Sequence, residues 1–299
     1  MAENITALYA GKAASGFMSA SLLSGETLAK GYITVLPNVA YKVNLNNFSM
    51  TAASVADSTC AFTDAGDVNY VEKALTPKRL QVNKALCKNN WLQTWAGSNM
   101  RAGLDGSLQS DFATYLISYA GSLVGQQVEK SIWQGAVATS GEFDGFEALL
   151  AADAAVVDVA AIAGGINAAN IIAEIGKVRD AIPAAVYGQE DTCIFMGTSA
   201  FRSYIAAQAQ LGYLNQYHAG VTESNFEGIP LKWCPGMSDN KMIAGRKSNM
   251  FFATDLEGDM TEVKLLDQTL VDGSDNVNLV MRFNAGVGYS TSADIVLYA

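Results

Sequence analysis

The residues that could carry out chemistry are few and widely separated in this chain of 299 residues. His218 is the only histidine, and no serine or cysteine near it forms a recognisable nucleophile motif, which favours a loop or interface role over general acid-base catalysis. GTSAF at Gly197 lacks the second glycine of the hydrolase elbow GxSxG, so Ser199 is interpreted as a residue at a helix start. These positions predict no catalytic residue and no enzyme.

Motifs for phosphate and metal ions are missing as well. No GxxxxGK[ST] loop occurs in the chain. Asp255, Glu257 and Asp259 alternate and could touch a hard cation, but a solvated turn is the more common role of such a triplet. We therefore expect neither a metal ion nor a cofactor.

The composition suggests a chain whose surface is covered by other subunits. Hydrophobic residues make up 50% of the chain and charged residues only 16%, against about 25% charged residues in an ordinary soluble domain. The most apolar stretch starts at Ala148 but is interrupted by Asp153 and Asp158, and no run reaches the ~18 uncharged apolar residues of a membrane-spanning helix. Burial of the surface in an oligomer therefore explains the low fraction of charged residues better than a membrane does.

The charge and the cysteines restrict the partners and the compartment. The net charge is −10, and lysine and arginine form no long block, which disfavours direct binding of nucleic acid. The first residues, MAENITALYAGKAASGF, have no basic region before an apolar stretch, so we expect no secretory signal. Without a CxxC pair, reduced cysteines are expected, and Cys60 is predicted to form no disulfide. The cysteines are Cys60, Cys87, Cys193 and Cys234.

A projecting hairpin is predicted after an arm of residues 1–38 that is rich in alanine, serine and glycine. From Val39 to Leu45, apolar and polar residues alternate as in a half-buried strand. The polar segment 51–67 follows, and then the extended runs VNYVEKAL and RLQVNKAL. A two-stranded hairpin is not stable alone, so it must pack against another part of the protein or against a neighbouring subunit. The expected contact residues of its tip are Ala52, Val55, Cys60, Phe62 and Asp64.

The longest predicted helix spans Ser110–Gln134, about 24 residues or roughly 36 Å. Its apolar residues recur at four-residue spacing, and Tyr115, Tyr119 and Leu123 are expected to widen this stripe. The stripe that should form the core comprises Phe112, Leu116, Ala120, Val124, Val128 and Ile132.

An α+β layer is predicted in the second half of the chain. A helix should begin near Asn167 and end before Pro183, with Glu174 on its exposed side. A strand at 192–198 and a second helix capped by Thr198 follow. Further strands are expected at 228–233, 241–245, 249–254 and from Met260 to the end of the chain.

The order of these pieces resembles the major capsid proteins of tailed bacteriophages, which have the Hong Kong 97-like fold. Local stretches are also similar to that family, namely VLPNVAYKVNL, ALTPKRLQVNKALCKNNWLQTW, NIIAEIGKVRDAIPAAVYG, IFMGTSAFRSYI and GIPLKW. The resemblance covers nearly the whole chain, although its motifs are packing patterns rather than invariant signatures.

The resemblance implies a division of the chain into functional segments. Residues 1–38 would be the N-terminal arm, 39–88 the extended loop (E-loop), and 89–140 the peripheral domain with its spine helix. Residues 141–254 would be the axial domain, and 255–299 the strands that return to the peripheral and axial domains. The lysine–asparagine cross-link of some family members has no match in this sequence.

The expected function is that of a self-assembling subunit of an icosahedral, double-stranded-DNA-containing bacteriophage head. The resemblance implies hexamers and pentamers in the shell, portal, scaffolding and decoration proteins as partners, no membrane, assembly in the host cytoplasm, and a final location in the virion. An encapsulin-type compartment is the nearest alternative. A cytosolic α/β enzyme and a surface-layer protein are alternatives of other classes.

The hairpin tip provides a first prediction. Residues 51–67 are too polar and irregular to build a core, so they should act between subunits. Replacing Ala52–Gly66 by a short turn should leave a folded, soluble subunit that cannot close shells. Circular dichroism would report the folding and sedimentation the assembly. Normal closed particles would remove the assembly role, and an unfolded monomer would make the segment part of the fold.

Overall fold

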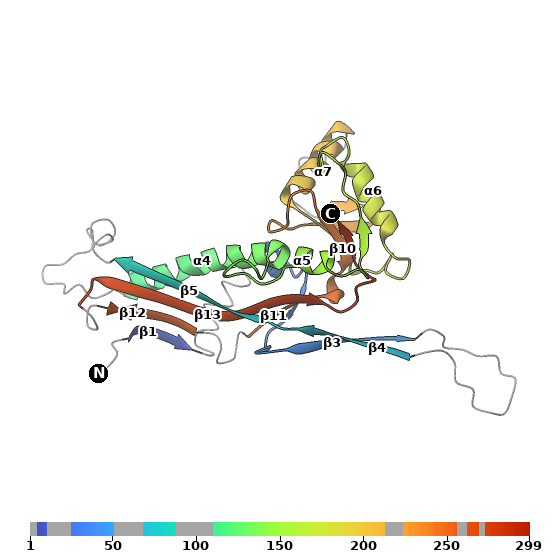
Figure 1. The fold of residues 1–299 in the computed structure, drawn as a ribbon. Helices are drawn as coiled ribbons and strands as arrows, with labels where there is room; N and C mark the ends of the chain where they lie inside the picture. Colours follow the sequence, from blue (N-terminus) through green and yellow to red (C-terminus); the bar gives the residue numbers. More distant parts are fainter. Residues whose placement is uncertain are drawn as a thin grey trace, which may run out of the picture.

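The computed structural model describes residues 5–10, 25–50, 68–87, 110–212, 224–255, 262–268 and 273–299. A long helix lies along an extended sheet, a compact lobe stands at one end of that helix, and a two-stranded hairpin projects beyond the lobe (Figure 1). The predicted tip residues Ala52, Val55, Cys60, Phe62 and Asp64 lie outside the described residues, as does His218. Helices and strands mix along the chain, so the α+β class is confirmed.

The extended sheet, called the peripheral sheet, is organised around the 14-residue strand β13 (Asn276–Tyr289). Its residues alternate between buried and half-buried along most of its length, as expected for a strand with one covered face. The strand order is β1-β12-β13-β11-β2, and β5 also pairs with β13. The other strands are β1 (Ile5–Ala10), β2 (Thr34–Leu36), β5 (Lys78–Cys87), β11 (Met250–Thr254) and β12 (Glu262–Asp267).

Helix α4 (Ser110–Gln134) has the predicted bounds and covers one face of this sheet (Figure 1). Leu116, Val124, Val128 and Ile132 are buried, and Ala120 packs half-buried against the same core. The side chain of Phe112 lies outside the described part of the structure.

The expected widening of this stripe by Tyr119 and Leu123 is wrong. These side chains are 55% and 48% exposed, and Ile117 and Trp133 enter the core instead. A four-residue step advances the helix by about 40° beyond a full turn, so a stripe of this spacing drifts around the helix. The sequence alone could not show on which side the sheet would lie.

The short helix α2 (Glu26–Ala29) ties the region after residue 24 to α4. Thr27 donates from its amide to Glu129 Oε2 at 3.2 Å and from its hydroxyl to Glu129 Oε1 at 2.5 Å. Trp133 Nε1 donates to the Thr27 hydroxyl at 3.0 Å. Burial raises the pKa of Glu129, and the Thr27 hydrogen bonds oppose that rise. Leu28, Tyr32 and Ile33 are buried, so this part of the expected arm belongs to the subunit's own core.

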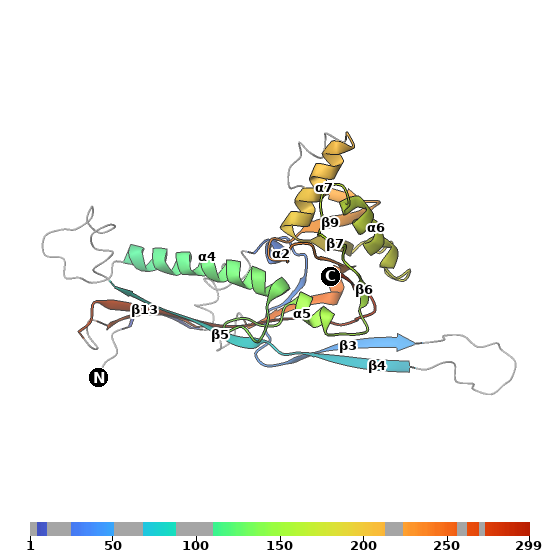
Figure 2. The ribbon, with the colours of Figure 1, turned by 45° about the horizontal axis from the view of Figure 1, so that its top comes forward.

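The lobe contains a second sheet, of order β6-β14-β10-β7-β9-β8, with helices α6 (Ile171–Ala181) and α7 (Thr198–Gln210) against one face (Figure 2). In β7, Ile194 and Met196 face these helices, whereas Cys193 and Phe195 face the core shared with α4 and α5 (Phe146–Ala151). The lobe strands are β6 (Val157–Val159), β7 (Thr192–Met196), β8 (Ser224–Phe226), β9 (Ile229–Trp233), β10 (Met242–Arg246) and β14 (Val296–Tyr298). The turn Lys247–Asn249 links β10 to β11.

Two details of the lobe differ from the sequence-based expectation. Glu174 is buried rather than exposed. Its carboxylate accepts hydrogen bonds from Tyr298 Oη at 2.9 Å and from Lys177 Nζ at 2.8 Å. Thr198 does not cap α7, because Gly197 occupies the cap position and the Thr198 hydroxyl accepts from Trp233 Nε1. Glu174 and Thr198 thus both accept hydrogen bonds from side chains of the lobe.

The core under α4 gives a testable prediction. Val124 is 5% exposed and lies beside Leu80 and Phe283 of the sheet. Val124→Asp would bury an unpaired carboxylate at a cost of about 3 kcal/mol or more, so soluble subunits should fail to accumulate. Leu123→Asp is the matched control, because its side chain is exposed and the variant should fold. Soluble yield and thermal unfolding check both, and normal yield of Val124→Asp would contradict the assignment.

Candidate inter-subunit surfaces

The hairpin consists of β3 (Val43–Met50) and β4 (Val68–Leu75), paired antiparallel over their full lengths. Only Thr76 and Pro77 separate β4 from β5, so the expected extended loop 39–88 passes directly into the peripheral sheet. Near the base, Leu45 and Leu75 are buried together with Val39 and Ala253. An added Cβ at Gly288 would lie 2.8 Å from Leu75 Cδ1, so the Leu75 side chain would have to shift to admit a larger residue at this point of β13.

A polar cluster holds the hairpin base against the segments that contain Asp153 and Ser292. Lys73 Nζ of β4 donates to Asp153 Oδ2 at 2.7 Å and to Ser292 Oγ at 2.6 Å. Tyr289 Oη and Ser292 Oγ each donate to the same carboxylate oxygen at 2.8 Å. The Lys73 ammonium also lies 3.9 Å from the centre of the Tyr289 ring. We call Lys73, Asp153, Tyr289 and Ser292 the Lys73 cluster.

The electrostatics of the cluster follow from these contacts. The Lys73 ammonium, and after it the Ala155 amide and the two hydroxyls, hold the pKa of Asp153 well below its ordinary value. Burial, and then the hydrogen bond to Asp153, raise the pKa of Tyr289. The cluster therefore holds a charged pair next to a neutral phenol at neutral pH. These contacts fix the orientation of the hairpin base.

The distal half of the hairpin exposes large apolar side chains. Phe48 is 66% and Tyr70 49% exposed, and their ring centres lie 6.0 Å apart in an edge-to-face pair. Because Phe48 and Tyr70 are directly opposite in the ladder, they share the hairpin face that points away from Lys73. Val68 is also exposed. Exposed apolar groups that gather on a projecting element mark an interaction surface.

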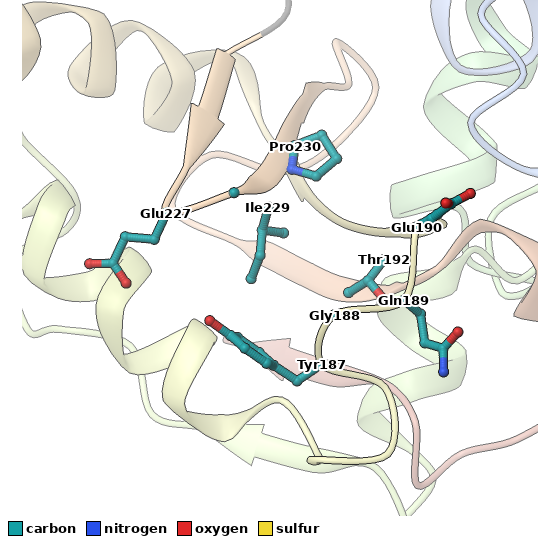
Figure 3. A pocket seen from close by; sticks show the side chains of 9 residues that line it. Tyr187, Gly188, Gln189, Glu190, Thr192, Glu227, Ile229 and Pro230 are labelled. Atoms are coloured by element: carbon teal, nitrogen blue, oxygen red, sulfur yellow. The ribbon is translucent and has the colours of Figure 1, made fainter.

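The remaining described surface offers little for small-molecule chemistry. A cavity of about 270 Å³ lies in the lobe beside Tyr187, Glu190 and Glu227 (Figure 3). Arg179 already pairs with Glu227. Burial raises the pKa of Cys193 to about 12 and that of Cys234 well above its ordinary value, so both thiols are unreactive. Among the described residues, no cluster of His, Cys, Asp or Glu could hold a metal ion.

The Lys73 cluster was not found by sequence reasoning. In the sequence, Asp153 stands out only as an interruption of an apolar stretch, and Lys73 lies 80 residues before it. No local spacing links these residues, since their meeting depends on β4 running along the end of β13. In the described part of the chain, no helix is long and apolar enough to cross a membrane.

Comparisons with known proteins identify the fold by structural similarity. No family model matches the chain, and no curated protein matches its sequence. The capsid of an empty GTA particle aligns with a TM-score of 0.60 at 13% identity, covering 91% of this chain and 89% of that one. The satellite phage P4 procapsid aligns at 0.59 with 11% identity, covering 95% and 97%. A virus-like particle from Pyrococcus furiosus aligns at 0.54 with 11% identity, covering 97% and 99%.

The chain therefore has the fold of proteins that build closed shells. The long helix on a sheet, the projecting hairpin and the lobe occur in the order expected from the sequence. The satellite phage P4 procapsid and a structure from Mycobacterium phage Che8 align along nearly the whole chain. More particularly, this is the Hong Kong 97-like fold of tailed-bacteriophage major capsid proteins, and the fold predicted from the sequence is confirmed.

The Lys73 cluster provides a prediction about pH. Asp153→Asn removes the charge that pairs with Lys73 and should lower the free energy of unfolding by about 1 kcal/mol at pH 7. Since the pKa of Asp153 is depressed in the folded state, its contribution is present above the unfolded value of about 3.9 and is lost as pH falls towards the folded value.

The difference between wild type and Asp153→Asn should thus be constant from pH 7 to about 4 and shrink only below that. Urea unfolding at a series of pH values measures it. Asp158→Asn, at an exposed position of the same segment, is the control and should leave stability unchanged. A difference that grows on acidification would show that the charged pair does not stabilise the base.

Proposed function

We propose that this chain is the major capsid protein of an icosahedral bacteriophage head that encloses double-stranded DNA. The observation that carries the proposal is the alignment with shell subunits over nearly the full length of both chains. The subunit also carries exposed aromatic residues on an element that projects from its body. Its role is structural, and assembly is its mechanism.

In this role, different segments of the chain make different contacts in the assembled shell. The hairpin within 39–88 lies over a neighbouring subunit, and its tip, with Ala52, Val55, Cys60, Phe62 and Asp64, makes the contact. The lobe within 141–254 meets its copies around the five- and six-fold axes. The segment 89–140, with α4, and the return strands within 255–299 form the rigid body. Hexamers and pentamers of the chain build the shell in the host cytoplasm, with portal, scaffolding and decoration proteins as further partners.

The net negative charge of the chain is compatible with a shell that encloses DNA. A net charge of −10 keeps free subunits soluble and reduces adhesion of the packaged phosphates to the shell as a whole. An encapsulin-type compartment is the second candidate, because the fold also builds a virus-like particle in an archaeal source. The content of the particle separates the two functions, since one holds a genome and the other holds protein.

Electron microscopy of the expressed chain tests the proposal. Negative staining should show closed or curved shells, and particles isolated from infected cells should protect double-stranded DNA from nuclease. Protein-filled particles without nucleic acid would favour the compartment. A chain that sediments only as a monomer and forms no curved assembly at high concentration would contradict both shell functions.

A further inference from the structure

The contact between α2 and α4 is built around one buried carboxylate. Glu129 of α4 is 6% exposed, and its two oxygens accept hydrogen bonds from the amide and the hydroxyl of Thr27. The Trp133 indole donates to the same hydroxyl. α2 lies beside α4 at the end of that helix nearest the lobe (Figure 2). Three hydrogen bonds around one acidic group therefore fix Thr27 on α4.

The backbone packs closely around this residue from two sides. A Cβ added at Gly25, the residue before α2, would overlap Glu129 Oε2. A Cβ added at Gly236, in the loop between β9 and β10, would overlap the main-chain carbonyl oxygen of Glu129. Because the start of α2 covers the carboxylate itself, a movement of α2 away from α4 would expose this group to water.

The cations of the elements packed around Glu129 make other contacts. Lys30 of α2 pairs with Glu26 at 2.9 Å. The Lys232 ammonium of β9 lies 5.5 Å from the centre of the Tyr32 ring. Glu129 is thus held mainly by hydrogen bonds from Thr27, which a neutral carboxyl group could also form.

Two further titratable residues lie near Glu129 in the described part of the chain. Lys130, the next residue of α4, is exposed. Burial, and after it the charge of Glu129, raise the pKa of Cys234 well above its ordinary value, so this thiol is neutral. Burial also raises the pKa of Glu129, the Thr27 hydrogen bonds oppose the rise, and the Glu26 carboxylate adds to it.

The direction of this pKa change determines how the contact depends on pH. A carboxyl group whose pKa is higher in the closed contact than in water binds its proton more tightly when α2 is docked. Docking is therefore strongest below the hydrated value of about 4.3. It weakens as the pH rises from there to the raised value and is constant above it.

We propose that α2 and Glu129 form a proton-dependent latch, which closes on α4 when Glu129 carries a proton and loosens when Glu129 is ionised. The protonated carboxyl group keeps both contacts with Thr27, because it can donate to the hydroxyl and accept from the amide. The segment held by the latch, 25–33, leads into β2, so the state of Glu129 sets how firmly this part of the chain is fixed. The latch is a property of the subunit and goes beyond the proposed shell function.

Hydrogen exchange of the full-length chain tests the latch. Mass spectrometry of peptides that span residues 25–33 gives protection factors at a series of pH values, after correction for the intrinsic exchange rate at each pH. Glu129→Gln provides the reference, because its side chain has the size of a neutral carboxyl group and does not titrate. The ratio of the wild-type to the Glu129→Gln protection factor should fall roughly threefold or more between about pH 4 and 8, since one linked proton permits up to about a tenfold change per pH unit.

Glu174→Gln is the matched control. Glu174 is also a buried carboxylate on a helix, but it lies on α6 and accepts hydrogen bonds from Tyr298 and Lys177 within the lobe. This variant should keep the wild-type pH dependence of protection in residues 25–33.

Thr27→Val provides a second test that does not change the acidic residue. It removes a hydroxyl that favours the ionised carboxylate, so the loss of protection should occur at a higher pH than in the wild type. If Glu129→Gln fails to fold, this shift decides, and an unchanged pH dependence in Thr27→Val would overturn the latch.

Other results would also overturn the inference. A ratio of protection factors that stays constant from about pH 4 to 8 would show that the proton on Glu129 does not control α2. A ratio that rises with pH would show that the ionised form holds α2 more firmly, which is the opposite of the latch. These outcomes are separate from the proposed function, because the exchange of residues 25–33 is measured whether or not the chain builds shells.

Discussion

The pairing of β13 with three other strands is the interaction on which the rest of the structure depends. Along its 14 residues, β13 bonds to β5, β12 and β11 and buries alternate side chains. Its last residue, Tyr289, belongs to the Lys73 cluster, and the chain then enters the lobe through β14. Sheet, hairpin and lobe are thus placed relative to one strand, so a register shift of one residue would misplace all three.

Elements with a clear period could be predicted from the sequence. The helix at 110–134 and the strands at 192–196 and 250–254 lie within a few residues of their expected positions, because apolar spacing at 3.6 or 2 residues reports a buried face directly. Contacts between distant polar residues could not be predicted. Thr27 and Glu129 are 102 residues apart, and nothing in either segment marks the other as a partner.

Exposure was the other quantity that the sequence did not reveal. Tyr119 and Leu123 look like core residues by type and spacing, yet the sheet packs on a different side of α4 and leaves them exposed. Phe48 and Tyr70 are similar cases on the hairpin. A low fraction of charged residues predicts that such surfaces exist somewhere in the chain, but their positions follow only from the packing. If the proposed shell function holds, part of what resembles a core in the sequence is surface that neighbouring subunits cover.

The two-residue connection between β4 and β5 has a mechanical consequence. With only Thr76 and Pro77 between the strands, and Pro77 packed on Gly286, little slack separates the hairpin from the sheet. A force that bends the hairpin is therefore carried into β5 and β13 rather than absorbed at a hinge. Under the proposed shell function, load applied to the hairpin of one subunit would therefore reach the peripheral sheet of that subunit directly.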